Sequence, residues 1–179
     1  MYRCRDECTI AASRDRCFAA LSDLSTYARW WTLITVSPEV RLVPGVRFRF
    51  VGARPGSAPL EWSADVVAVD EPARIELEYG GVYVGRTAWE LDDVEGGTRV
   101  AYVYRGVSPT SERTREHFAR WGTRLHSVAM KEDALAGLAR FLGGAGSELD
   151  DDGWRALVRK RVGAAIRALD GKPTGSMTS

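Results

Sequence analysis

The chain has 179 residues, with 25 Lys and Arg against 24 Asp and Glu and a formal net charge of +1. This length fits one domain with room for a short additional element. The balanced charge argues against a nucleic-acid-binding protein, which is usually markedly basic. Since no apolar run reaches the length of a membrane-spanning helix, we expect neither a nucleic-acid partner nor an integral membrane segment.

The first predicted element is a strand over residues 2–11, in which side chains of different polarity alternate. Cys4, Asp6 and Cys8 share one face of it. Strand geometry places the Cα atoms of the two cysteines about 13 Å apart, which is too far for a disulfide. The third cysteine is Cys17, and the N-terminus carries charges where a secretory signal would be apolar. The sequence therefore predicts a reduced, cytoplasmic chain.

Two short helices are expected next. Ser13 precedes a turn that contains Asp15, so it can cap a first helix. Asp23 or Ser25 can cap a second helix that ends at the Trp30-Trp31 pair. The two helices would form a corner, and the two tryptophans would either gate an entrance to the interior or pack that corner.

Residues 33–109 have the pattern of strands joined by short turns. A Ser37-Pro38 pair interrupts the first, over residues 33–43, and indicates an edge strand or a bulge. Alternation then predicts strands over residues 46–51, 60–69, 74–79, 82–91 and 98–106. With the N-terminal strand this gives about seven strands, and their short connections require an antiparallel sheet.

A long helix is predicted over residues 111–142, where apolar side chains recur at helical spacing. Gly122 lies inside it and costs about 1 kcal/mol relative to alanine. We therefore expect a kink or two helices, with the packed part over residues 123–142. A glycine-rich joint at residues 143–146 leads to an amphipathic helix over residues 147–169, which would dock on the domain or on a second subunit. Residues 171–179 should be a disordered tail.

Three stretches resemble the START-like SRPBCC superfamily: ECTIAASRDRCFAALSDLSTYARWW, AWELDDVEGGTRVAYVY and HSVAMKEDALAGLARFL. Their order and spacing carry the resemblance. It implies an α+β helix-grip fold over residues 1–143, with an antiparallel sheet wrapped around a long C-terminal helix and an apolar cavity between them. The joint and appended helix (144–170) and the tail (171–179) lie outside the pattern. The superfamily includes polyketide cyclases and dehydrases, lipid and hormone carriers, and cochaperone-like proteins.

The face of the sheet that would line this cavity is rich in aromatic side chains. Apolar walls with a few hydroxyls suit a flat or hydrophobic ligand, and a cavity provides partners for buried tyrosine hydroxyls. The alternative is that these side chains simply fill the core. The expected ligand-binding residues are Phe48, Phe50, Trp62, Tyr79, Tyr83, Trp89, Tyr102, Tyr104, Leu125 and Ala129.

Three residues are candidates for catalysis. His126 lies beside the apolar face of the long helix, and histidine is the natural acid or base near neutral pH. Glu132 borders the same face, where burial would raise the pKa of a carboxyl group, and Tyr102 offers a hydroxyl. The alternatives are a solvated histidine at the rim and a Glu132 carboxylate paired with Lys131 or Arg86.

The sequence predicts no metal site and no cofactor. Cys4, Asp6 and Cys8 share a strand face, but no further histidine or cysteine ligand lies close to them in the sequence. Phosphate-loop and dinucleotide-binding glycine patterns are absent from the sequence.

The leading hypothesis is a domain that encloses a small hydrophobic or aromatic molecule. A polyketide cyclase or dehydratase is the alternative from the enzyme class. A cochaperone-like or stress-response domain that binds protein is the third, and a homodimer is compatible with each of them.

Overall fold

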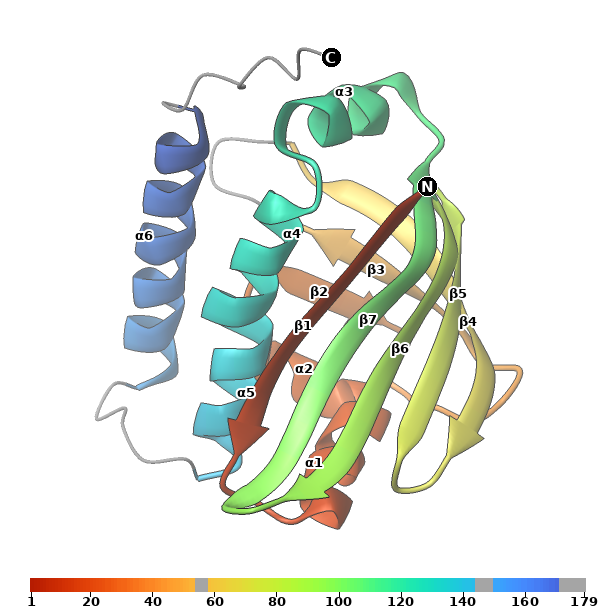
Figure 1. The fold of residues 1–179 in the computed structure, drawn as a ribbon, viewed down its shortest axis with the longest axis vertical. Helices are drawn as coiled ribbons and strands as arrows, with labels where there is room; N and C mark the ends of the chain where they lie inside the picture. The colour runs from red at the N-terminus through yellow and green to blue at the C-terminus, as the bar shows by residue number, and fades with distance from the viewer. Residues whose placement is uncertain (54–57, 144–149, 171–179) are drawn as a thin grey trace.

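The structure is a computed structural model that describes residues 1–53, 58–143 and 150–170. Its centre is one seven-stranded sheet in the order β1-β7-β6-β5-β4-β3-β2, and every pairing is antiparallel. The sheet curls around a helix (Figure 1), so the predicted α+β helix-grip fold is confirmed. The strands are β1 (Tyr2–Ile10), β2 (Ile34–Ser37), β3 (Arg47–Gly52), β4 (Leu60–Asp70), β5 (Arg74–Gly81), β6 (Tyr83–Val94) and β7 (Gly97–Pro109).

Short helices close one end of the curled sheet. They are α1 (Arg14–Ser22), the 3-10 turn η1 (Leu24–Thr26) and α2 (Tyr27–Trp30), at the bottom of Figure 1. The Ser13 side chain caps α1 by accepting a hydrogen bond from the backbone N–H of Arg16. The Asp23 carboxylate accepts one from the backbone N–H of Ser25 and caps η1 in the same way.

The predicted long helix is two helices. The helix α3 (Glu112–Trp121) crosses the other end of the sheet, and a rod formed by α4 (Arg124–Ala129), the π-helical segment η2 (Met130–Leu135) and α5 (Ala136–Phe141) runs along its concave face (Figure 1). Gly122 separates them with a φ of 58°, a left-handed conformation that glycine adopts at little cost. The interior glycine therefore marks a change of direction.

The last described helix, α6 (Asp151–Asp170), packs against the outer side of the α4–η2–α5 rod (Figure 1). Its buried residues Trp154, Val158 and Val162 meet Leu33 and Val128. The expected joint from residue 144, the expected helix start at residue 147 and the expected tail at 171–179 lie outside the described residues. No helix among the described residues is long and apolar enough to cross a membrane.

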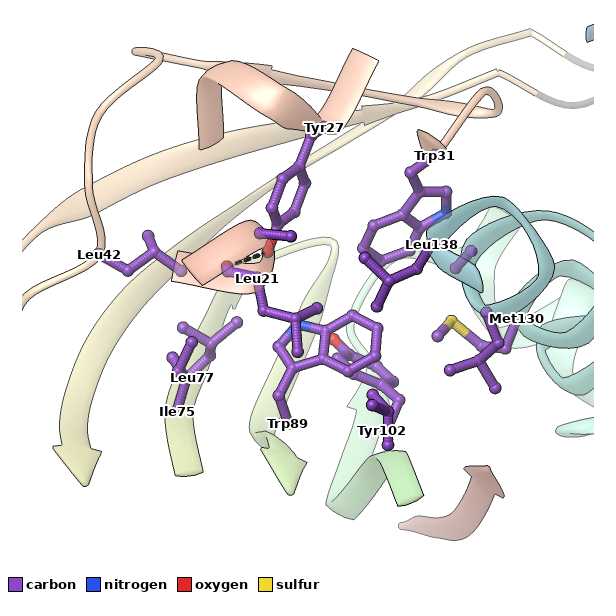
Figure 2. Close-up of a cluster of buried hydrophobic side chains, with 14 of the residues drawn as sticks. Leu21, Tyr27, Trp31, Leu42, Ile75, Leu77, Trp89, Tyr102, Met130 and Leu138 are labelled. Carbon is purple, nitrogen blue, oxygen red and sulfur yellow. Dashed lines mark hydrogen bonds between the residues drawn. The ribbon is translucent and has the colours of Figure 1, made fainter. Parts of the chain in front are cut away.

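Large side chains fill the interior at the α1–α2 end of the sheet. Figure 2 shows Trp31, Trp89 and Tyr102 packed together between the sheet and Met130 and Leu138 of the rod. The Tyr27 hydroxyl donates a 2.8 Å hydrogen bond to the carbonyl oxygen of Leu21, which satisfies a polar group inside this apolar cluster.

Candidate functional site

A pocket beneath α3 adjoins this packed cluster and shares Trp31, Tyr102 and Met130 with it. Its volume is about 300 Å³, at the lower end of the range for sites that bind small molecules. Its aromatic wall comes from the loop before β2, from β4–β7 and from α3. The aromatic residues of that wall are Trp31, Trp62, Tyr79, Tyr83, Tyr102, Tyr104, Phe118 and Trp121.

Six of the residues predicted to bind a ligand line this pocket: Trp62, Tyr79, Tyr83, Tyr102, Tyr104 and Ala129. The other four, Phe48, Phe50, Trp89 and Leu125, are almost fully buried outside its lining. Phe50 stacks behind Trp62 at a ring-centroid distance of 5.1 Å, and Trp89 packs edge-on against Trp30. Alternation along a strand identifies the concave face, but only the helices at each end decide which part of that face is filled.

The wall formed by α3 was missed by sequence reasoning. His117, Phe118 and Trp121 line the pocket, with Arg113 and Arg120 beside them. The sequence pattern treats this segment as the first turns of one long helix. Gly122 is the signal that could have identified this wall, because a change of direction at that glycine lets the preceding helix fold over the end of the sheet.

A hydrogen-bond network of hydroxyl groups lies at the floor of the pocket. The Tyr102 hydroxyl donates to Thr87 Oγ1 at 3.2 Å and shares a further hydrogen bond with the Tyr79 hydroxyl. Burial raises the pKa of Tyr79 to about 12, although its hydrogen bonds to Tyr102 and Thr87 work in the opposite direction. Burial likewise raises the pKa of Tyr102 well above its ordinary value. Both tyrosines are therefore neutral near pH 7.

The catalytic candidate His126 reaches the pocket wall from α4. Its ring packs on Tyr104 at a centroid distance of 4.1 Å, and its Nδ1 lies 3.3 Å from Oδ2 of Asp6 on β1. The Asp6 side chain is only 2% exposed and also accepts a 3.1 Å hydrogen bond from the Ser127 hydroxyl. Asp6 thus holds the imidazole of His126 in a fixed orientation.

The pKa of Asp6 shows which influence dominates at this carboxylate. Burial works to raise that pKa, but hydrogen bonds from His126 and Ser127, together with the electrostatic influence of His126 and Lys131, outweigh burial and lower it. On the same strand, burial and the Asp6 charge raise the pKa of the Cys4 thiol to about 11. Asp6 is therefore ionised and Cys4 is a neutral thiol near pH 7.

The other acidic candidate, Glu132, lies outside the pocket lining. Its carboxylate is 3.5 Å from the Arg161 guanidinium of α6, and the side chain is 42% exposed. Glu132 faces the appended helix, a neighbour that no local pattern could identify.

Residues 11–132 match the model of a protein family described as activator of Hsp90 ATPase homolog 1-like protein. The chain belongs to this family. The Hsp90-activator-like family, as we call it below, is part of the START-like SRPBCC superfamily, so the resemblance inferred from the sequence is confirmed. Among curated proteins, none matches the chain.

Solved structures share the fold of this Hsp90-activator-like domain at low sequence identity. Protein Ms6760 from Mycobacterium smegmatis is 18% identical with a TM-score of 0.60, over 78% of this chain and 90% of that chain. The protein encoded by BPP1335 of Bordetella parapertussis is 16% identical with a TM-score of 0.61, over 98% and 88%. DynU16, a protein of the dynemicin biosynthetic locus, is 19% identical with a TM-score of 0.52, over 78% and 46%. These similarities show the fold alone.

Proposed function

We propose that this domain binds a small aromatic or hydrophobic molecule in the pocket beneath α3. The observation that carries the proposal is the pocket itself, about 300 Å³ with a wall of tryptophan and tyrosine rings. Burying about 200 Å² of apolar ligand surface there would contribute about 5 kcal/mol before the cost of immobilising the ligand. A volume of this size suits a molecule of about two fused rings.

The lining of the pocket favours a flat ligand with one polar end, because aromatic rings form its wall and a few polar groups lie beside them. The interior offers the half-buried Tyr104 and His126, while Arg113, Glu116 and Arg120 lie on the α3 side. Arg113 bridges the α3 side to the β3–β4 connection by donating a hydrogen bond to the Ala58 carbonyl oxygen. The apolar part of the ligand would lie against the rings, and its polar end would meet Tyr104 and His126.

The test uses 2-naphthol, which has two fused rings and one hydroxyl, in calorimetric titration of the full chain. Leu60 lines the pocket, so Leu60→Trp should fill it and lower the affinity at least about tenfold. The matched control is Val84→Trp on β6, because Val84 is 41% exposed and outside the pocket lining. Equal 2-naphthol affinities for the wild type and for Leu60→Trp would overturn the proposal.

A second comparison tests how a polar end is recognised. The hydroxyl of 2-naphthol should give it a higher affinity than naphthalene by about 1 kcal/mol, or about fivefold. Tyr104→Phe should remove most of that preference. Tyr102→Phe is the control, because the Tyr102 hydroxyl belongs to the network with Thr87 and Tyr79 at the floor of the pocket. A preference that survives Tyr104→Phe would mean that the polar end is bound elsewhere.

A reaction on the bound molecule is the second candidate function, and the contact between His126 and Asp6 favours it. A carboxylate that orients a histidine at a pocket wall is suited to proton abstraction, and a cyclisation would also gain from holding a flexible chain folded. The test substrate is a short poly-β-keto thioester. For a cyclase, His126→Ala should lose most of the rate acceleration and keep the substrate affinity. Unchanged cyclisation rates in that variant would remove this candidate.

The family description names an activator of the Hsp90 ATPase, and a protein partner was the third hypothesis. On the outer face of the sheet several charges are paired within the chain, as in Arg47 with Asp65 and Arg105 with Glu90. Pairing of this kind leaves less charge on that face for a partner to recognise. The enclosed aromatic pocket therefore gives small-molecule binding the stronger support.

A further inference from the structure

Three potential metal ligands meet between β1 and α4. They are the Sγ of Cys4, a carboxylate oxygen of Asp6 and a ring nitrogen of His126, and all three atoms lie within 4.8 Å of one another. The Cys4 Sγ is 3.7 Å from His126 Nδ1, and that nitrogen is 3.3 Å from Asp6 Oδ2. We propose that Cys4, Asp6 and His126 form a binding site for a divalent transition-metal ion of the zinc type.

The spacing of the donor atoms fits such an ion. Zinc binds thiolate sulfur at about 2.3 Å and imidazole nitrogen or carboxylate oxygen at about 2.0–2.2 Å in a tetrahedron. Tetrahedral angles then place sulfur and nitrogen about 3.6 Å apart, and nitrogen and oxygen about 3.4 Å apart. The structure has 3.7 Å for Cys4 and His126 and 3.3 Å for His126 and Asp6. These two donor pairs therefore already have the spacing of a tetrahedral site, and the neutral Cys4 thiol would release its proton to solvent as its sulfur binds the ion.

The donor types also select this class of ion. Zinc and neighbouring metals such as cobalt accept a mixed set of sulfur, nitrogen and oxygen ligands. Magnesium and calcium prefer sets made of oxygen alone. Three protein ligands leave the fourth tetrahedral position to water.

The fold holds the proposed ligands in place. Cys4 pairs with Tyr104 and Asp6 with Tyr102 across the β1–β7 ladder, so both side chains point to the concave face under α4. The Ser127 hydroxyl donates a hydrogen bond to Asp6 Oδ2, a supporting contact of the kind that orients a metal-binding carboxylate. Because Asp6 is 2% exposed, its charge is partly shielded from water and attracts a cation strongly.

One cation already approaches the cluster. The Lys131 Nζ lies 4.0 Å from Asp6 Oδ1, and the lysine side chain is 62% exposed. This flexible, solvated chain can move away when a metal ion arrives. Its charge would nevertheless compete with the ion, so Lys131→Met should raise the metal affinity severalfold.

The test measures Co²⁺ binding to the full chain after treatment with a chelator. Co²⁺ is a spectroscopic substitute for Zn²⁺, and its bond to a thiolate gives a charge-transfer absorption in the near ultraviolet. We expect this absorption to saturate at one equivalent of Co²⁺ and to disappear on addition of Zn²⁺. Its absence from the wild-type protein would overturn the proposal without any need for a variant.

Two matched variants locate the site. Cys4→Ser should abolish the absorption and weaken Zn²⁺ binding about tenfold or more. Cys8→Ser should leave both unchanged, because Cys8 lies on the same strand face but outside the three-ligand cluster. Circular dichroism confirms that each variant is folded. Zn²⁺ binding that is equal in Cys4→Ser and the wild type, or lost in Cys8→Ser, would also overturn the proposal.

Discussion

The indole Nε1 of Trp121 donates a 2.8 Å hydrogen bond to Oδ1 of Asp170. Trp121 lies at the end of α3 and lines the pocket, whereas Asp170 is the final residue of α6. The same carboxylate oxygen lies 2.9 Å from the Arg120 guanidinium. The appended helix thus stabilises the α3 wall of the pocket.

The first prediction follows from this link. Asp170→Ala removes the acceptor for Trp121 and the partner of Arg120, at a cost of about 1 kcal/mol to the docking of α3. Amide hydrogen exchange over residues 112–121 should become about fivefold faster, and 2-naphthol should dissociate faster. Asp152→Ala is the control, since the 91% exposed Asp152 carboxylate pairs with Arg155 within α6. Equal exchange in the two variants would show that α3 is held without Asp170.

The second prediction concerns a glycine at a helix contact. A Cβ atom at Gly137 of α5 would lie 1.9 Å from the carbonyl oxygen of Trp30. Although alanine normally favours a helix over glycine by about 1 kcal/mol, Gly137→Ala should destabilise the protein by about 1–3 kcal/mol through overpacking. Urea unfolding measures the change.

The matched control for this prediction is Gly163→Ala in α6, where the nearest atom to an added Cβ is a flexible Arg167 nitrogen at 3.6 Å. There the ordinary helix preference should apply, and stability should rise by up to about 1 kcal/mol. Stabilisation at both positions would contradict the close approach of α2 and α5.

The third prediction is a pH dependence that originates at Asp133. Burial raises the pKa of this carboxyl from 3.8 to about 6, although hydrogen bonds from the backbone of Thr32 and Leu33 and from the Thr32 hydroxyl oppose the rise. Between about pH 4 and pH 6 the folded protein therefore keeps a proton that the unfolded chain has released. The stability that this group contributes is complete below about pH 4 and is lost as the pH rises through 6.

Asp133→Asn isolates this effect, because the amide does not titrate. The free energy of unfolding of the wild type minus that of the variant should fall by about 3 kcal/mol between pH 3 and pH 7, at about 1.36 kcal/mol for each pKa unit. Urea unfolding at several pH values measures it. The loss of one hydrogen-bond acceptor in the amide adds an offset that does not change with pH. Parallel pH curves would show that the Asp133 pKa is close to its ordinary value.

The fourth prediction concerns Glu132. Because its carboxylate is exposed and paired with Arg161 outside the pocket, Glu132→Gln should change stability by less than about 1 kcal/mol. The affinity for 2-naphthol should not change. A large loss of affinity in a calorimetric titration would return Glu132 to the candidate site.

The sequence by itself determined the approximate positions of the strands, their antiparallel pairing and the superfamily. The strands and their pairing follow from local rules, since alternation identifies strands and short turns require antiparallel neighbours. Gly122 is a local signal too, because it marks the change of direction between α3 and α4. Alternation also identified the concave face, which is why Trp62, Tyr79 and Tyr104 were predicted to bind a ligand and do line the pocket.

Only the tertiary structure decided which part of that face is open and which residues meet there. Side chains such as Phe48 and Trp89 have the same alternation as pocket residues, but they lie in the part of the interior that is packed solid. His126 follows Cys4 by 122 positions, so no local pattern could place the two side by side. Such contacts depend on how a helix lies across a strand, which is set by packing of the whole core and not by sequence spacing.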